Sequence, residues 1–193
     1  MDVSPSLPSS ELQRLQFLRA CEIFDTDPEE FFDAIVEEAA LATSMPIVLI
    51  SLIDEDRQWF KSVRGLDIEE TPRDVSFCGH AILGSETMIV PDALKDARFA
   101  ENSLVIGDPH IRSYAGALLH NAAGVPLGTL CAIDRKPRNL TKVQIQRLEK
   151  LARKVSRLIE IRFLNQQAKR QMKELHQTEG QLMNLVSEMF EAA

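Results

Sequence analysis

The sequence predicts an α+β protein with a central antiparallel sheet of five or six strands and helices on both faces. Segments with the apolar periodicity of helices lie at both ends of the chain, and short apolar runs rich in β-branched residues lie between them. The runs follow one another through short turns and do not alternate with helices. This order is typical of an antiparallel meander and not of a βαβ fold.

The composition is that of a soluble domain with one appendage. Of the 193 residues, 45% are hydrophobic and 26% are charged. No run approaches the roughly 18 apolar residues of a membrane span, and the first ten residues lack a secretory signal, so we expect a cytoplasmic protein without a membrane partner. Three widely spaced cysteines argue against a disulfide framework. A net charge of −7 disfavours nucleic acid as a partner.

The N-terminal part predicts a tail followed by two helices. Residues 1–9 are rich in serine and proline, and we expect them to be a disordered tail. A helical segment over residues 10–26 begins at Ser10, with Gln13 placed to complete a capping box.

The second helix, over residues 27–44, has stronger signals. Asp27 is a candidate cap, Pro28 suits the first helical position and Glu30 completes the box. Its expected apolar face includes Phe31 and Ile35, together with neighbouring aliphatic residues. We therefore expect this helix to pack on the sheet.

The strands are predicted from apolar runs bounded by turn residues. The run "PIVLISLID" is continuous and apolar, as a buried central strand would be. Within "GVPLGTLCAID", Gly128 permits close approach of a neighbouring backbone. A short helix is expected to open near Ser76. The expected strands are 46–54, 57–65, one that ends at Pro91, and two within 113–134 that are joined near 121–124.

The last element is a long helix that begins at Thr141, whose side chain caps it while Gln144 reaches back. From Thr141 to Glu179 alone it would be roughly 60 Å long, about twice the width of such a domain. Its apolar residues repeat with heptad spacing, so we expect a coiled-coil signalling helix over 164–193 and a homodimer through the terminal helices, parallel or antiparallel. The predicted seam is Leu151, Leu158, Ile161, Asn165, Met172, Leu175 and Leu182.

Three segments together resemble one family. They are "IVLISLIDEDRQWFKSVRGL", then "FCGHAIL" followed by "MIVPDALKDARFAEN", and finally "GVPLGTLCAIDRKPRNLTKVQIQRLEKLA". In this order and spacing they resemble the GAF domains of bacterial histidine kinases and cyclic-dinucleotide signalling proteins. The resemblance implies a PAS-related domain over residues 27–163. It places the helices 27–44 and 141–163 on one face of the sheet and a ligand pocket on the other.

The resemblance puts this pocket beneath the short helix and the loops between residues 76 and 115. Such pockets are mostly apolar with a few polar groups. The alternative is that the aromatic residues are simply core and that Arg112 is a surface cation. The candidate residues are Phe77, Cys78, His80, Ile82, Asp92, Phe99, Val105, Arg112 and Tyr114.

Covalent and metal chemistry have weaker support. Free methionine-(R)-sulfoxide reductases carry a similar Cys-Gly pair but need further cysteines in the following loop, which here has none. Bilin-binding relatives place the cysteine next to a histidine, whereas Gly79 separates Cys78 from His80. No two histidines or cysteines show metal-ligand spacing. We therefore expect Cys78 to be a packing residue and name no cofactor, metal or catalytic residue.

The function predicted from the sequence is a non-catalytic module that senses a signal and dimerises. It would pass the state of a small-molecule ligand through the C-terminal coiled coil to an output domain, in cis or in trans, such as a histidine kinase or a diguanylate cyclase. The chain shows no kinase, cyclase or phosphodiesterase motif, so we expect the chain itself not to be an enzyme and leave open that a longer parent protein is one. The alternatives are a methionine-sulfoxide reductase and a chromophore- or haem-binding sensor.

Overall fold

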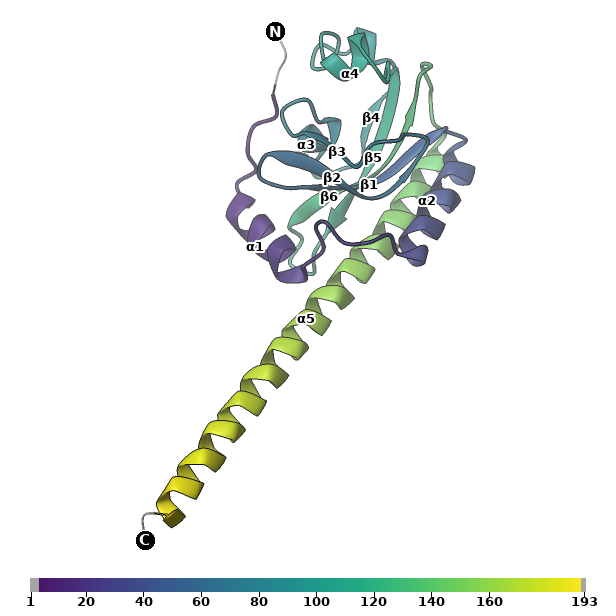
Figure 1. Ribbon diagram of the computed structural model, residues 1–193. Coiled ribbons are helices and arrows are strands. Elements are labelled where there is room, and N and C mark those ends of the chain that lie inside the picture. The colour runs from purple at the N-terminus through teal and green to yellow at the C-terminus, as the bar shows by residue number, and fades with distance from the viewer. Residues whose placement is uncertain (1–3, 192–193) are drawn as a thin grey trace.

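A six-stranded antiparallel sheet in the order β3-β2-β1-β6-β5-β4 forms the centre of the molecule (Figure 1). The computed structural model describes residues 4–191, with side chains described through residue 184 and at 187 and 189. The elements are α1 (Glu11–Cys21), α2 (Glu30–Thr43), β1 (Ile47–Ile53), β2 (Arg57–Arg64), β3 (Glu70–Pro72), α3 (Phe77–Ala81), β4 (Met88–Val90), the 3₁₀ helix η1 (Ala93–Lys95), α4 (Ser103–Ile106), β5 (Ser113–His120), β6 (Pro126–Asp134) and α5 (Lys142–Glu191). The predicted fold class and central sheet are thereby confirmed.

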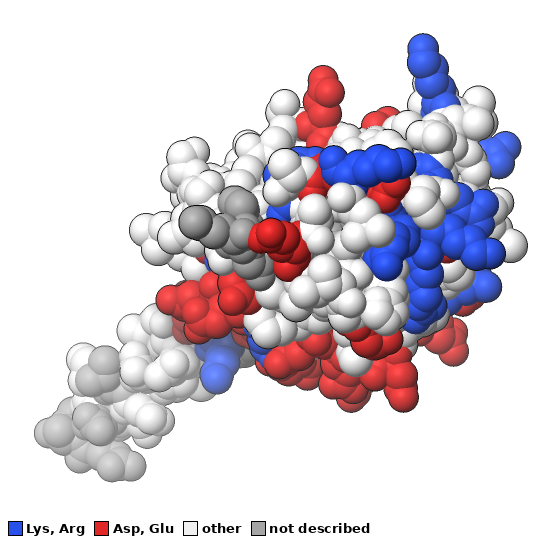
Figure 2. Space-filling view, turned by 90° about the horizontal axis from the view of Figure 1, so that it is seen from above, with Lys and Arg blue, Asp and Glu red and all other residues white. Residues whose placement is uncertain are grey.

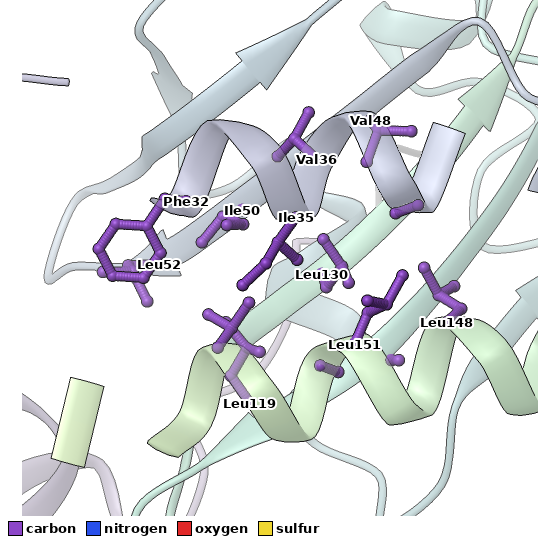
Figure 3. Close-up of a cluster of buried hydrophobic side chains, with 14 of the residues drawn as sticks. Phe32, Ile35, Val36, Val48, Ile50, Leu52, Leu119, Leu130, Leu148 and Leu151 are labelled. Carbon is purple, nitrogen blue, oxygen red and sulfur yellow. The ribbon is translucent and has the colours of Figure 1, made fainter. Parts of the chain in front are cut away.

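The helices α1, α2 and α5 cover one face of the sheet. Phe32 and Ile35 of α2 and Leu148 of α5 pack there against Ile50 of β1 and Leu130 of β6, all buried (Figure 3). Each large side chain buried in this way contributes about 1.5–3 kcal/mol. We call this surface the helix face of the sheet.

Short segments cover the opposite face, which we call the α3 face. The alternate residues of β1, Ile47, Leu49 and Ile53, point into a second buried cluster that also holds Phe77 of α3 and Val105 of α4. Both faces of β1 are thus covered, and this explains why its sequence is a continuous apolar run rather than an alternating one.

Close packing of β1 on β6 depends on Gly128. The two strands are paired in continuous register up to Leu52 and Gly128. A Cβ atom at Gly128 would collide with the carbonyl oxygen of Ser51. The predicted close approach at this glycine is therefore present.

The start of α2 differs from the prediction. The helix begins at Glu30, and no side chain caps it. The carbonyl oxygen of Asp27 instead accepts a hydrogen bond of 2.8 Å from Lys61 Nζ, which holds this segment in an extended approach to the sheet. Phe31 is 47% exposed and packs on the ring of Phe32, so it does not belong to the buried face of the helix.

The N-terminal segment also departs from the predicted capping. Ser10 precedes α1, but its side chain makes no capping hydrogen bond, and the predicted box with Gln13 is absent there. Residues 4–9 contain no helix or strand, and Pro5 lies against Gly79 of α3. Residues 1–3 of the expected tail lie outside the described residues.

The long helix α5 begins as predicted and then leaves the domain (Figure 1). The Thr141 N–H donates to Gln144 Oε1 over 2.9 Å, and the Gln144 N–H donates to Thr141 Oγ1 over 3.3 Å. The 50 residues correspond to a length of about 75 Å. In the part of the chain with described placement, no helix is long and apolar enough to cross a membrane.

Only the first turns of α5 pack on the sheet. Leu151 of the predicted seam is 3% exposed because α2 and the sheet cover it, and Leu158 is half-buried. Beyond them the seam residues are open to solvent: Ile161, Asn165, Met172, Leu175 and Leu182.

Candidate functional site beneath α3

The short helix α3 is held tightly at its start. Ser76 Oγ accepts a hydrogen bond of 2.8 Å from the Gly79 N–H and donates one to Gln58 Oε1 of β2. This cap fixes the two following residues, Phe77 and Cys78, so that both point down onto the sheet, where they are 3% and 1% exposed.

An aromatic stack closes the space between α3 and the loop that follows η1. The rings of Phe77 and Phe99 lie parallel with centroids 3.9 Å apart, and Tyr114 lies 5.3 Å from Phe77. His80 packs edge-on against Phe99 at 5.0 Å. The residues chosen from the sequence therefore do come together, and they fill the space beneath α3 with their own side chains.

Beneath the stack lies a buried group of sulfur and hydroxyl atoms. The Sγ atoms of Cys78 and Cys131 are 3.7 Å apart. Tyr114 Oη donates to Cys78 Sγ over 3.4 Å and lies 3.4 Å from Thr129 Oγ1. Ser51 Oγ is buried beside them without a well-formed hydrogen bond in the described part of the chain. We call Ser51, Cys78, Tyr114, Thr129 and Cys131 the thiol–hydroxyl cluster.

The two thiols of the cluster differ in pKa. Burial by itself raises the pKa of Cys78, but hydrogen bonds from Cys131, Thr129 and Tyr114 outweigh it and lower the pKa to about 7. The pKa of Cys131 is raised well above its ordinary value by burial and by its neighbour Cys78. The thiolate form, which is the nucleophile and the metal ligand, is therefore concentrated at Cys78.

The remaining candidate residues surround this core. Asp92 caps η1 through a hydrogen bond from the Leu94 N–H and pairs with Lys95 at 2.9 Å. Arg112 donates to the carbonyl oxygens of Val105 and Ile111 over 2.8 and 3.0 Å. Both charged groups thus hold the loops that cover the α3 face.

None of the nine candidate residues lines any of five surface hollows of about 320–590 Å³ in the described part of the chain. A ligand beneath α3 would have to displace part of the aromatic stack. Ligand binding at these residues stays a prediction.

Sequence reasoning missed Ser51 and Thr129. Ser51 does carry a signal, because it is the one hydroxyl residue inside the apolar run Ile47–Ile53. No three or more His, Cys, Asp or Glu side chains among the described residues gather in a way that would hold a metal ion.

A second set of contacts links the sheet to α5 through α1. Arg14 of α1 is fully buried and donates to the Ile53 carbonyl oxygen and to Glu11. Glu11 also pairs at 2.6 Å with Arg73, whose carbonyl oxygen accepts a hydrogen bond from the N–H of the α3 cap Ser76. The start of α1 is therefore tied to the start of α3.

The other end of α1 is bound to α5. Arg162 donates to the carbonyl oxygens of Cys21 and Glu22 over 3.0 and 2.8 Å, and Phe163 packs on Phe17 at 4.6 Å. Arg170 pairs with Glu22 at 2.8 Å. We call these contacts the α1–α5 junction.

This architecture and the comparisons agree. The family model of the GAF domain matches residues 27–159, which is more than half of the chain. The chain belongs to the GAF family. A GAF sensory domain is thus the class of protein that the sheet, the covering helices and the site beneath α3 define.

A curated relative corrects one prediction. The chain is 43% identical over 153 residues to the cyclic di-GMP phosphodiesterase PA2567 of Pseudomonas aeruginosa, and the match covers 79% of this chain. The chain spans only 26% of that protein's length. The prediction that the chain is not an enzyme was wrong, because a relative that is 43% identical to it is named as a phosphodiesterase.

Solved structures support the fold. The GAF domain of Thermosynechococcus elongatus PixJ, in its blue-light-absorbing form, is 16% identical with a TM-score of 0.58, covering 89% of this chain and 98% of that one. The free methionine-R-sulfoxide reductase of Neisseria meningitidis is 18% identical with a TM-score of 0.54, covering 85% and 95%. At these identities the likeness concerns the fold alone.

Proposed function

We propose that the chain is the regulatory GAF domain of a signalling protein that hydrolyses cyclic di-GMP. The observation that carries this proposal is the 43% identity to a cyclic di-GMP phosphodiesterase over most of the chain. In the sequence-based hypothesis the output was a histidine kinase or a diguanylate cyclase. The relative favours a phosphodiesterase output instead.

The sensory element of the proposal is the α3 face. Its cover consists of the five-residue helix α3, the four-residue helix α4, a 3₁₀ turn and loops, whereas the thiol–hydroxyl cluster below is polar and incompletely hydrogen-bonded. Elements with few packed turns open at lower free-energy cost than long helices. A small molecule or an oxidant of thiols that reached the cluster would therefore displace α3 before any other element.

The transmission route of the proposal runs through α1. Displacement of α3 moves Ser76 and Arg73, and Arg73 holds Glu11 at the start of α1. The opposite end of α1 is fixed to α5 by Arg162 and Arg170. A rigid α1 would convert a shift at the sheet into a shift of α5.

The same helix provides the proposed dimer contact. Met172, Leu175 and Leu182 are 57–61% exposed along one heptad stripe of α5. A second copy of the chain covers this stripe most simply, because a lone helix would leave each side chain in water at a cost of about 1.5–3 kcal/mol. The dimer would then place two output domains side by side. The proposed location of the protein is the cytoplasm.

The test replaces the matched segment of the Pseudomonas aeruginosa phosphodiesterase with this chain. We expect the chimera to sediment as a dimer and to hydrolyse cyclic di-GMP. The double variant Leu158→Glu with Leu175→Glu should sediment as a monomer, and its hydrolysis rate should change at least threefold. The matched control, Leu7→Glu with Ile68→Glu, alters two exposed aliphatic residues outside α1, η1 and α5 and should behave as the parent. A monomeric variant with the parent's hydrolysis rate would refute regulation through α5.

A further inference from the structure

A hollow of about 500 Å³ lies at the end of the sheet where β6 leaves for α5. Its walls come from the C-terminal end of α2, the start of β1, the end of β2 and the segment that follows β6. It is separate from the thiol–hydroxyl cluster, because none of the cluster residues lines it. Its lining combines positive charge with apolar surface.

Four cationic side chains border this hollow: Arg64, Arg135, Lys136 and Arg138. Asp134 is the one carboxylate among the lining residues, and Arg64 also pairs with Glu37 at 2.5 Å, so the hollow with its ion pairs carries about two net positive charges in a chain whose total charge is −7. In the view of Figure 2, Lys and Arg side chains gather on the right-hand side of the molecule. A hollow of this kind attracts anions.

Two of the guanidinium groups are held in place while their outer nitrogens stay available. Arg138 Nε donates to Asp134 Oδ2 over 2.7 Å, and Arg135 Nε donates to the Pro109 carbonyl oxygen over 3.0 Å. Within the described residues, the terminal nitrogens of both side chains have no hydrogen-bond partner. Anchored guanidinium forks bind phosphate with less loss of side-chain entropy than free ones.

Apart from Ser44, the rest of the lining is apolar. Ala40, Leu41, Met45 and Pro46 form this part of the wall, and Leu41 is 78% exposed. A bare inorganic ion would leave this surface and most of the volume unused. A ligand with a flat apolar part and a phosphate group would satisfy both halves of the hollow.

We propose that this hollow binds a nucleotide-sized phosphate ester, with the phosphates on Arg135, Lys136 and Arg138 and the ring against Leu41 and Pro46. The site lies next to the N-terminal end of α5, since residues 135–138 lead directly into the Thr141 cap of this helix. Gln144 of α5 also donates to the carbonyl oxygen of Thr43 of α2 over 2.9 Å. An occupant would thus touch the end of α2 and the segment that leads into α5, without passing through α3. This proposal goes beyond the regulatory function above and does not depend on it.

The experiment titrates the 193-residue protein with ATP by calorimetry, at 50 and 300 mM salt, with adenosine and pyrophosphate as separate probes. We expect ATP to bind with a sub-millimolar dissociation constant that weakens at the higher salt concentration. Pyrophosphate should bind more weakly than ATP, and adenosine more weakly still. The variant Arg135→Gln with Lys136→Gln should weaken ATP binding at least tenfold. Both residues are exposed, so the fold should tolerate the change.

The matched control removes two exposed cations elsewhere. Arg19→Gln with Lys95→Gln lowers the net charge by the same amount, and both side chains are at least 60% exposed. It should bind ATP within about twofold of the parent. The proposal is overturned if the two double variants lose affinity equally, if adenosine binds as tightly as ATP, or if ATP does not bind at 1 mM. None of these outcomes bears on the phosphodiesterase chimera.

Discussion

The two faces of the sheet are covered in different ways. Long helices lie on the helix face, where β1 contributes Val48, Ile50 and Leu52 to an apolar cluster. Short segments lie on the α3 face, where Ser51 and Cys78 belong to a buried polar group. The long helices bury a continuous apolar stripe and open only at high free-energy cost, whereas the short segments open at low cost. One sheet thus combines a stable scaffold with a cover of short segments that opens more readily.

The largest expected effect is a loss of stability on the helix face. Phe32 is 1% exposed between α2 and the sheet, so Phe32→Ala should lower the free energy of unfolding by about 4 kcal/mol. Phe99→Ala on the α3 face should cost less, about 2–3 kcal/mol, because the short segments can collapse into the space that is left. Urea denaturation of both variants measures the difference. A greater loss for Phe99→Ala would contradict the assignment of the two faces.

A smaller loss of stability is expected at the start of α1, where Glu11 joins this helix to Arg73. Burial alone would raise the pKa of Glu11, but hydrogen bonds from Arg73 and Arg14 outweigh it and lower the pKa from 4.5 to about 2. A carboxylate whose pKa is lowered by folding stabilises the fold at pH values above its pKa in the unfolded chain. This stabilisation is lost as the pH falls from about 4.5 towards 2. Glu11→Gln should therefore cost about 2–3 kcal/mol at pH 7 and progressively less below pH 4.

The control for Glu11 is an exposed carboxylate on the same side of the molecule. Glu55 pairs with Arg19, and both side chains are at least 60% exposed. Glu55→Gln should change the free energy of unfolding by less than about 0.5 kcal/mol at every pH. If the two variants showed the same pH profile, Glu11 would not be the group that ties α1 to the α3 segment.

Much of this architecture could be predicted because it depends on local pattern. The apolar run 46–54, the cap at Thr141 and Gly128 all express short-range rules of strand, helix and close packing. The start of α2 was predicted wrongly, because the tertiary contact of Lys61 with the Asp27 carbonyl competes with local capping. Tertiary contacts of this kind leave no trace in the neighbouring sequence.

The site was predicted in part for the same reason. The resemblance to the family brought Phe77, Phe99 and Tyr114 together correctly, but it could not show that their rings stack and fill the space. The buried Arg14 was also missed, since an arginine in an amphipathic helix ordinarily faces solvent. Its partner carbonyl at Ile53, and Arg73 that shares its Glu11 carboxylate, lie far along the chain and are found only in three dimensions.

Chemical labelling of the cysteine thiols perturbs the structure least and tests the difference between the two faces most directly. Cys21 lies on the helix face, where burial and Glu160 raise its pKa to about 12. Cys78 lies on the α3 face, where its pKa is about 7. From the sequence we expected Cys78 to be a packing thiol that reacts no faster than the others. Its surroundings in the structure now lead us to expect the opposite order.

The measurement is the rate of alkylation of each thiol in the folded full-length chain at pH 7.5, followed by peptide mass spectrometry. We expect Cys78 to react at least about 100-fold faster than Cys21, because the thiolate is the reacting form and α3 opens more readily than α1. The rate at Cys78 should rise with a midpoint near pH 7. Equal rates at Cys78 and Cys21, or faster reaction at Cys21, would contradict the view that the α3 face is the responsive side of the sheet.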